Sequence, residues 1–206
     1  MRSAFDFAKY FIQNGNDENT FDGNMKLQKL LSFANLISYA KTEKPLFQEP
    51  MLAYDNGCVV EPIRARYCYD YDALVSQSRA FNPSFSKEEY DILRATLALF
   101  GSLSARELSD IQHDFDFWAS ANQRPGQIVT EDDIKPELWR IQSVLEAQAE
   151  SERQCLKSER INGVTYHYEP GFQFTDELVQ WLYGFAETAD DDSYTIYYDD
   201  GKLVIY

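Results

Sequence analysis

The chain is poor in cysteine and has no long apolar run. Its 206 residues include 3 Cys, namely Cys58, Cys68 and Cys155, which form no Cys-x-x-Cys pair and cannot all pair with one another. Such a sparse set is typical of a reducing compartment, so we expect a cytoplasmic protein. No run of about 18 apolar residues occurs, which excludes a predicted transmembrane helix. Asp6 and Lys9 interrupt the apolar stretch that a secretory signal peptide would have.

Motifs for phosphate, metal and cofactor chemistry are also missing. The sequence has neither Gly-x-Gly-x-x-Gly nor Gly-x-x-x-x-Gly-Lys-Ser/Thr, and it has no His-Glu-x-x-His or His-x-His. The acidic residues lack the spacing of an EF-hand loop, and we interpret Asp190-Asp191-Asp192 as a solvated loop. We therefore expect no metal and no cofactor.

Positive charge is scarce. The formal net charge is -15, from 19 Lys and Arg against 34 Asp and Glu. This balance argues against direct binding to a nucleic-acid backbone, which requires a basic face. It suits a soluble protein with a basic protein partner. Residues 151–206 carry 4 basic and 11 acidic side chains, so the C-terminal segment is the more acidic part of the chain.

The residues that are present predict a helical body. Leu27, Leu30, Leu31, Ala34 and Ile37 have the i, i+3, i+4, i+7 spacing of one buried helix face, which predicts a helix over about 25–41. We expect the polar residues between them to face away from the core: Lys26, Gln28, Lys29, Ser32 and Asn35.

Capping signals place the other helices. Ser-x-x-Asp/Glu patterns at Ser3, Ser86 and Ser104 predict helix starts, and Gly15 and Gly101 are natural stops. Residues 14–24 are interpreted as a loop, and Asn56-Gly57 as a tight turn. Two proline-initiated helices are predicted from Pro62 and from Pro136 to about Glu152.

The last quarter has a different pattern. Val164 to Tyr168 alternate as in a strand, Thr175 caps a short helix, and the Asp200-Gly201 pair between two Tyr- and Ile-rich runs predicts a β-hairpin. The predicted fold class is mainly α, with a compact helical body over 1–150 and a small α+β appendage (strand, helix, β-hairpin) over 151–206.

Candidate catalytic groups are few. The only histidines are His113 and His167, and we interpret His113 as a structural histidine near the end of a helix. An alternative stays open: Cys58 follows a glycine turn and could be a nucleophile with His113 as its base, as in a small hydrolase or transferase. A helix–turn–helix over 86–117 is a weaker interpretation, because its second helix carries Glu107 and Asp110 where DNA recognition needs basic and amide side chains.

Several blocks in a fixed order carry a more specific signal. They are Met25–Asn35 (MKLQKLLSFAN), Lys44–Phe47, Asp55–Val60, Gly101–Leu108 and His113–Trp118. From about residue 4 to about residue 122, the chain resembles the Panacea domain, also called the SocA-like antitoxin domain. The sequence departs from the family pattern at four positions: Ser32 (usually aromatic), Tyr54 (usually Trp), Cys58 (usually Pro) and Gln112 (typically Thr).

The resemblance implies a mainly helical antitoxin of a type II toxin–antitoxin system. Such a protein is no enzyme; it neutralises a cognate protein toxin by direct binding, and a role in phage defence is implied as well. One alternative that the family offers is an adaptor that presents its toxin to a protease. We expect a structural role for the residues of the matching blocks: Leu27, Leu30, Leu31, Phe33, Ser104, His113 and Trp118.

The partner-binding surface is predicted at two places. The first is the tail, which lies beyond the resemblance, with its acidic and aromatic residues Asp190, Asp191, Asp192, Tyr197 and Tyr198. Aromatic residues are enriched at interfaces, and acidic ones would attract a basic toxin. The second is the turn at Asn56 and Gly57 with the nearby polar helix face of Lys26 and Lys29.

Overall fold

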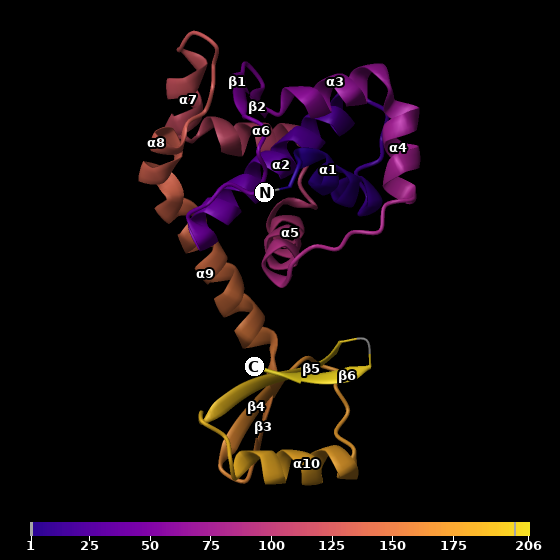
Figure 1. The fold of residues 1–206 in the computed structure, drawn as a ribbon. Helices are drawn as coiled ribbons and strands as arrows, with labels where there is room; N and C mark the ends of the chain where they lie inside the picture. Colours follow the sequence, from indigo (N-terminus) through magenta and orange to yellow (C-terminus); the bar gives the residue numbers. More distant parts are fainter. Residues whose placement is uncertain (1, 200) are drawn as a thin grey trace. The chain divides into compact units, whose positions relative to one another are not determined.

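The computed structural model describes residues 2–199 and 201–206, and for residues 152–155 it describes the backbone alone (Figure 1). The chain forms two compact units, Met1–Leu145 and Glu146–Tyr206. It is mainly α-helical, as predicted, with a four-stranded sheet in the second unit. The boundary predicted at 150/151 and the observed one both lie in helix α9 (Leu138–Cys155). In the described part of the chain, no helix is long and apolar enough to cross a membrane.

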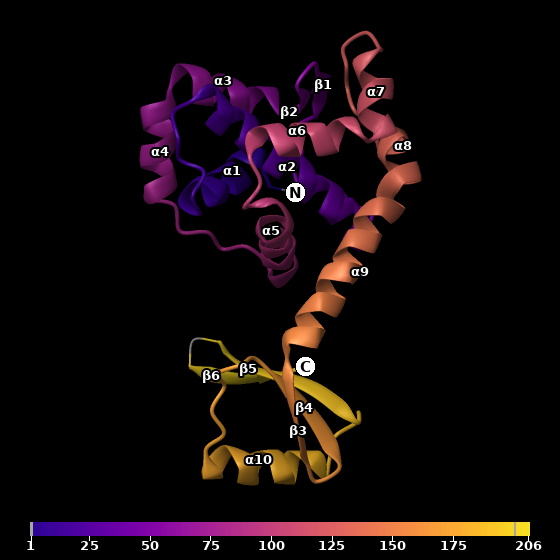
Figure 2. The same ribbon diagram turned by 180° about the vertical axis from the view of Figure 1, so that it is seen from behind.

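Helix α2 (Phe21–Thr42) is the centre of the first unit. Figures 1 and 2 show it surrounded by other elements of this unit, and it contacts helices on several sides together with the short strand β2. These neighbours are α1 (Ala4–Gln13), α3 (Glu61–Tyr69), α5 (Lys87–Phe100), α6 (Ala105–His113) and β2 (Gly57–Val59). Helix α4 (Tyr71–Arg79) packs on α1, and α7 (Asp116–Asn122) leads through α8 (Glu131–Ile134) and η1 (Lys135–Glu137) into α9.

The start of α2 corrects the predicted loop over 14–24. The helix begins at Phe21, because Thr20 caps it by accepting a hydrogen bond from the Gly23 amide at 2.9 Å. The loop then passes so close to the helix that a Cβ on Gly23 would lie 2.1 Å from the Glu18 carbonyl oxygen. A glycine inside the first turn therefore marks a close approach here and not a break.

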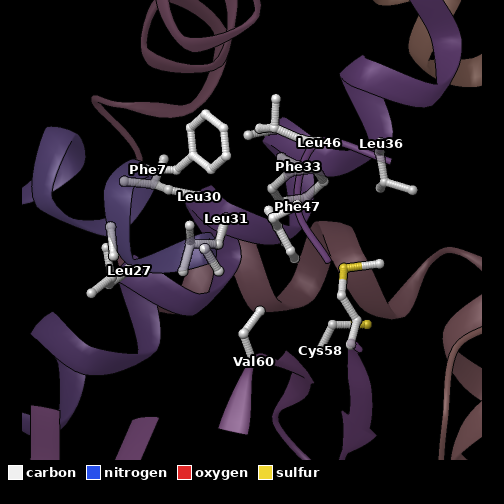
Figure 3. Packing of buried hydrophobic residues seen from close by; sticks show 14 of the residues in the cluster. Phe7, Leu27, Leu30, Leu31, Phe33, Leu36, Leu46, Phe47, Cys58 and Val60 are labelled. Atoms are coloured by element: carbon white, nitrogen blue, oxygen red, sulfur yellow. The ribbon is translucent and has the colours of Figure 1, made fainter. Parts of the chain in front are cut away.

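The prediction that the polar residues of α2 face away from the core was wrong. Gln28, Lys29, Ser32 and Asn35 are between 1% and 5% exposed, and Lys26 is half-buried. The reason is that α2 is enclosed on all sides, so its polar residues are buried against neighbours that satisfy their hydrogen bonds. The apolar prediction is confirmed, since Leu27, Leu30, Leu31 and Phe33 are at most 1% exposed in the core (Figure 3).

Capping predictions were largely confirmed. Ser86 and Ser104 each form a complete capping box, with Glu89 and Glu107 respectively, and Ser3 caps α1. Pro62 lies one residue inside α3, which begins at Glu61. The helix predicted from Pro136 begins as the 3-10 turn η1 and continues as α9, while the helices α4, α7 and α8 had not been predicted.

The second unit is an α+β layer. Its sheet has the order β3 (Lys157–Ile161), β4 (Val164–Tyr168), β5 (Ser193–Asp199) and β6 (Lys202–Ile205), with β4 and β5 parallel and the other pairs antiparallel. Helix α10 (Asp176–Ala186) connects the parallel pair and covers one face of the sheet (Figure 1). The predicted hairpin forms, with Gly201 at φ +74°, while Asp200 lies outside the described residues. Strand β3 had not been predicted.

Candidate functional site

A two-stranded hairpin lies across α2, between α6 and α7. Strand β1 (Leu52–Tyr54) pairs antiparallel with β2. The turn residues between them are Asp55 and Asn56, one position earlier than the predicted Asn56-Gly57 turn, and Gly57 begins β2 with φ +97°. An isolated two-stranded hairpin is marginally stable in water, because its outer edges lack partners. This hairpin therefore needs partners from other elements of the unit.

Polar side chains of α2 and α6 supply the missing partners of β2. The Cys58 amide donates to Gln112 Oε1 at 2.5 Å, and the Val60 amide donates to Gln28 Oε1 at 2.8 Å. Gln112 in turn donates through Nε2 to Ser32 Oγ at 2.7 Å. We call these three side chains, together with Lys29 and Ser109, the hairpin clamp.

Lys29 and Ser109 hold the turn itself. The Asn56 carbonyl accepts a hydrogen bond from the Lys29 ammonium and a second from Ser109 Oγ at 2.9 Å. Lys29 Nζ also lies 3.5 Å from the Cys58 carbonyl oxygen. The lysine is 1% exposed, so a full positive charge is buried beneath the turn.

The edge of β1 is satisfied from the C-terminal side of the unit. Trp118 Nε1 donates to the Tyr54 carbonyl at 2.9 Å, and Asn122 Nδ2 donates to the Ala53 carbonyl at 2.8 Å. The Ala53 amide donates to the Gln127 carbonyl, also at 2.8 Å. The hairpin is thus fixed on both edges, and Trp118 supplies one of these hydrogen bonds.

Burial sets the electrostatics of the clamp. Desolvation lowers the pKa of Lys29 to about 8. Among the described residues, no carboxylate lies within ion-pair distance of this ammonium. The carboxylate of Glu61, on the neighbouring helix α3, pairs with Arg64, at 2.6 Å between Oε1 and Nη2. Burial also raises the pKa of the Cys58 thiol to about 12. Cys58 is 0% exposed, so it is neither accessible nor ionised at neutral pH, which removes the support for the Cys58 nucleophile.

His113 ends α6 next to the clamp. Its ring packs on the Trp118 ring with centroids 4.0 Å apart, and its Nε2 is buried and lacks a hydrogen-bond partner among the described residues. This packing agrees with a structural histidine. In the described part of the chain, no group of His, Cys, Asp and Glu could hold a metal ion.

A pocket of about 470 Å³ opens beside the hairpin. Its lining comes from the first half of α2, from the hairpin, from α3, and from Gln127 in the loop after α7. The residues are Phe21, Asn24, Met25, Gln28, Lys29, Tyr54, Asp55, Asn56, Val59, Arg64 and Gln127. Lys29 thus belongs both to the clamp and to the pocket wall.

The predicted partner-binding residues are not all available. Asn56 is exposed at the turn, whereas Gly57 is buried, and Lys26 donates to the Gly101 carbonyl at 2.8 Å. In the tail, Asp190, Asp191 and Asp192 are exposed.

The two tail tyrosines do not form one surface. Because successive strand residues point to opposite faces, Tyr198 lies on the α10 side, stacked on Phe172 at 5.3 Å between centroids, and Tyr197 lies on the other side against Tyr206 at 5.8 Å.

Residues 27–119 match the family model described as antitoxin SocA-like, Panacea domain. The resemblance stated from the sequence is therefore confirmed for this Panacea segment, which is shorter than the 4–122 expected. The whole clamp lies inside it. No curated protein and no solved structure matches the chain.

Three of the four positions that the resemblance marked as departures, Ser32, Cys58 and Gln112, are joined by hydrogen bonds at the clamp. Gln112 binds both Ser32 and the Cys58 amide, and a proline at position 58 would have no N–H to donate. Sequence reasoning missed Gln28, Ser109 and Gln112 as site residues, although Gln112 and Ser32 had been recognised as departures from the pattern.

A substitution at Gly57 tests how closely the clamp packs against the turn. Its φ is +97°, and an added Cβ would lie 2.4 Å from both Gln112 Oε1 and Lys29 Nζ. Gly15 is a matched control, because its φ is +96° with nothing within 4 Å of an added Cβ. Both alanine variants carry the backbone strain, but only Gly57→Ala adds the clash, which we expect to cost about 1–3 kcal/mol more in urea unfolding. If Gly57→Ala and Gly15→Ala lower the free energy of unfolding equally, the clamp has room for the added methyl group and is not closely packed.

Lys29 makes stability depend on pH with a definite sign. Its pKa is lowered on folding from 10.5 to about 8, so between these values the unfolded state binds a proton that the folded state has released. Stability should therefore rise with pH above about 8, by on the order of 3 kcal/mol in total. The measurement is the free energy of unfolding of the parent minus that of Lys29→Met from pH 7 to 10, with the exposed Lys44→Met as control. Parallel curves for parent and Lys29→Met would contradict the assignment.

Proposed function

We propose that this protein is the antitoxin of a type II toxin–antitoxin system and that it neutralises a protein toxin by binding it directly. The observation that carries the proposal is the match of residues 27–119 to the SocA-like antitoxin Panacea domain. Its place of action in this proposal is the cytoplasm, where sparse and unpatterned cysteines stay reduced.

The site supports binding more than catalysis. The one cysteine considered as a nucleophile, Cys58, is buried with a raised pKa, and its amide and carbonyl serve the hairpin clamp. We therefore propose that the protein is not an enzyme. The clamp instead produces a fixed surface, and a rigid surface lowers the entropy lost when a partner binds.

The second unit offers a second surface that suits a basic toxin. Residues 146–206 contain 13 acidic and 4 basic side chains. Helix α10 covers one face of its sheet, and in the described part of this unit no element covers the other, which bears Tyr197, Thr195 and Val204. We propose that the toxin binds this open sheet face, with Asp190 to Asp192 increasing the association rate.

An adaptor function is a second candidate. An adaptor that presents a toxin to a protease needs two separate binding surfaces, and the division into two compact units would provide them. An antitoxin that acts by occlusion alone needs only one.

The test begins with genes encoded next to this one. Expression of the toxin alone should stop growth, and co-expression with this chain should restore it.

Tyr197→Ser should weaken toxin binding about tenfold or more if Tyr197 is an interface anchor. The adjacent Tyr198→Ser is the matched control, because Tyr198 lies on the opposite face. Replacing Asp190, Asp191 and Asp192 by Asn should slow association and reduce its salt dependence.

Thermal unfolding first confirms that the variants are folded, so that a change in affinity reports on the interface. Equal affinity for the Tyr197 and Tyr198 variants would reject the open sheet face as the binding surface. The absence of any neighbouring gene whose toxicity this chain relieves would reject the antitoxin function itself.

A further inference from the structure

The pocket beside the hairpin has an unusual charge arrangement. At about 470 Å³ it has the size of a ligand site. Its lining includes the apolar surfaces of Phe21, Met25, Tyr54 and Val59. Phe21 is 72% exposed, which is high for a phenylalanine and places a large apolar ring at the pocket without a cover.

The polar lining residues are mostly occupied by internal contacts. Gln28 donates to Asn24 Oδ1 at 3.2 Å and accepts from the Val60 amide, and Asn24 donates to the Cys68 thiol at 3.3 Å. Arg64 forms two hydrogen bonds with the Glu61 carboxylate, at 2.7 and 2.6 Å, which neutralise its charge. These groups form the wall, and they are not free for a ligand.

Lys29 differs from these groups in its charge. Its buried ammonium also donates to backbone carbonyls, those of Asn56 and Cys58, but it pairs with no carboxylate among the side chains that the structure describes. A buried charge without a counter-charge is costly, and its field is strong because the surroundings are poorly polarisable. Asp55 also lines the pocket, but it is exposed to solvent, which screens its negative charge. Lys29 is therefore a buried positive charge in the pocket wall without a carboxylate partner among the described side chains.

We infer that this pocket is an anchor site for a carboxylate that stands next to an apolar side chain, supplied by a segment of the partner protein. The carboxylate provides the counter-charge for Lys29, and the apolar group packs on Phe21 and Met25. This inference rests on the proposed function for the nature of the partner. The carboxylate can be a chain terminus or an acidic side chain, and the probes below separate these two sources.

The experiment uses the full chain and three small probes. N-acetyl-phenylalanine carries a terminal carboxylate beside an aromatic ring, N-acetyl-aspartyl-phenylalaninamide carries a side-chain carboxylate, and N-acetyl-phenylalaninamide carries none. Binding is followed by the NMR signals of the Met25 methyl group and of the Asn56 and Gly57 amides. At least one acidic probe should bind about fivefold or more tightly than the neutral amide. The tighter of the two acidic probes identifies the source of the carboxylate.

A pH titration adds a readout that a simple apolar pocket would not give. A bound carboxylate favours the charged ammonium, so the acidic probe should bind more weakly as pH rises through about 8, the pKa of Lys29 in the free protein. The neutral amide should show no such change. Equal binding of acidic and neutral probes, signals that shift elsewhere on the protein, or no binding at all would each overturn the inference.

Two variants and a control complete the test. Lys29→Met should abolish the preference for the acidic probes, and Lys44→Met, which removes an exposed lysine, should leave it unchanged. Because Lys29 also holds the hairpin, Lys29→Met can unfold the protein. Met25→Glu avoids this problem: it places a carboxylate on the pocket wall and should block the acidic probes in the same way. Unchanged acidic preference in folded Met25→Glu would reject the site.

Failure of this inference is distinguishable from failure of the proposed function. Neutralisation of a neighbouring toxin without any carboxylate preference in the pocket would reject the anchor and keep the antitoxin. Carboxylate binding in a protein that neutralises no neighbouring toxin would reject the antitoxin and keep the pocket chemistry.

Discussion

The buried hydrogen bonds between α2, α6 and the hairpin are the constraint on which the first unit depends. Without them, the amides of Cys58 and Val60 and the carbonyl of Asn56 would lose the protein partners that fix the hairpin. An unsatisfied buried amide or carbonyl costs about 1–3 kcal/mol. Gln112, Gln28, Lys29 and Ser109 therefore determine where the hairpin lies, and the hairpin in turn forms one wall of the pocket.

The same contacts explain how a helix with polar residues on every side can be a core helix. The polar residues of α2 are buried because each has a specific partner, and a fully satisfied polar network makes a packed arrangement unique. Lys29 is a fully buried member whose charge has no carboxylate partner among the described side chains, so it both holds the hairpin and places a positive charge in the pocket wall. The pocket proposed as an anchor site thus follows from a packing requirement in the core.

The sequence allowed the helical class, most caps and the approximate places of the two hairpin turns to be predicted, because these depend on local rules such as Ser-x-x-Glu and Asp-Gly. It failed where distant residues decide the outcome. The periodicity of α2 correctly identified Leu30 and Leu31 as buried, yet it placed Lys29 outside, since no local rule shows that α6 and a hairpin cover that side. The error at Tyr197 and Tyr198 was of another kind, because strand alternation already places neighbouring residues on opposite faces. The contacts of Tyr198 with Phe172 and of Tyr197 with Tyr206 show which face each side chain occupies.

Amide hydrogen exchange at Cys58 and Val60 tests the central claim most directly. Both amides donate to side chains and not to another strand, so their protection reports on the clamp alone. The account predicts that they exchange as slowly as the amides of the central turns of α2, that is, only through unfolding of the unit. Exchange at the rate of an ordinary exposed hairpin, faster than the α2 amides by orders of magnitude, would show that the hairpin opens independently and would contradict the account.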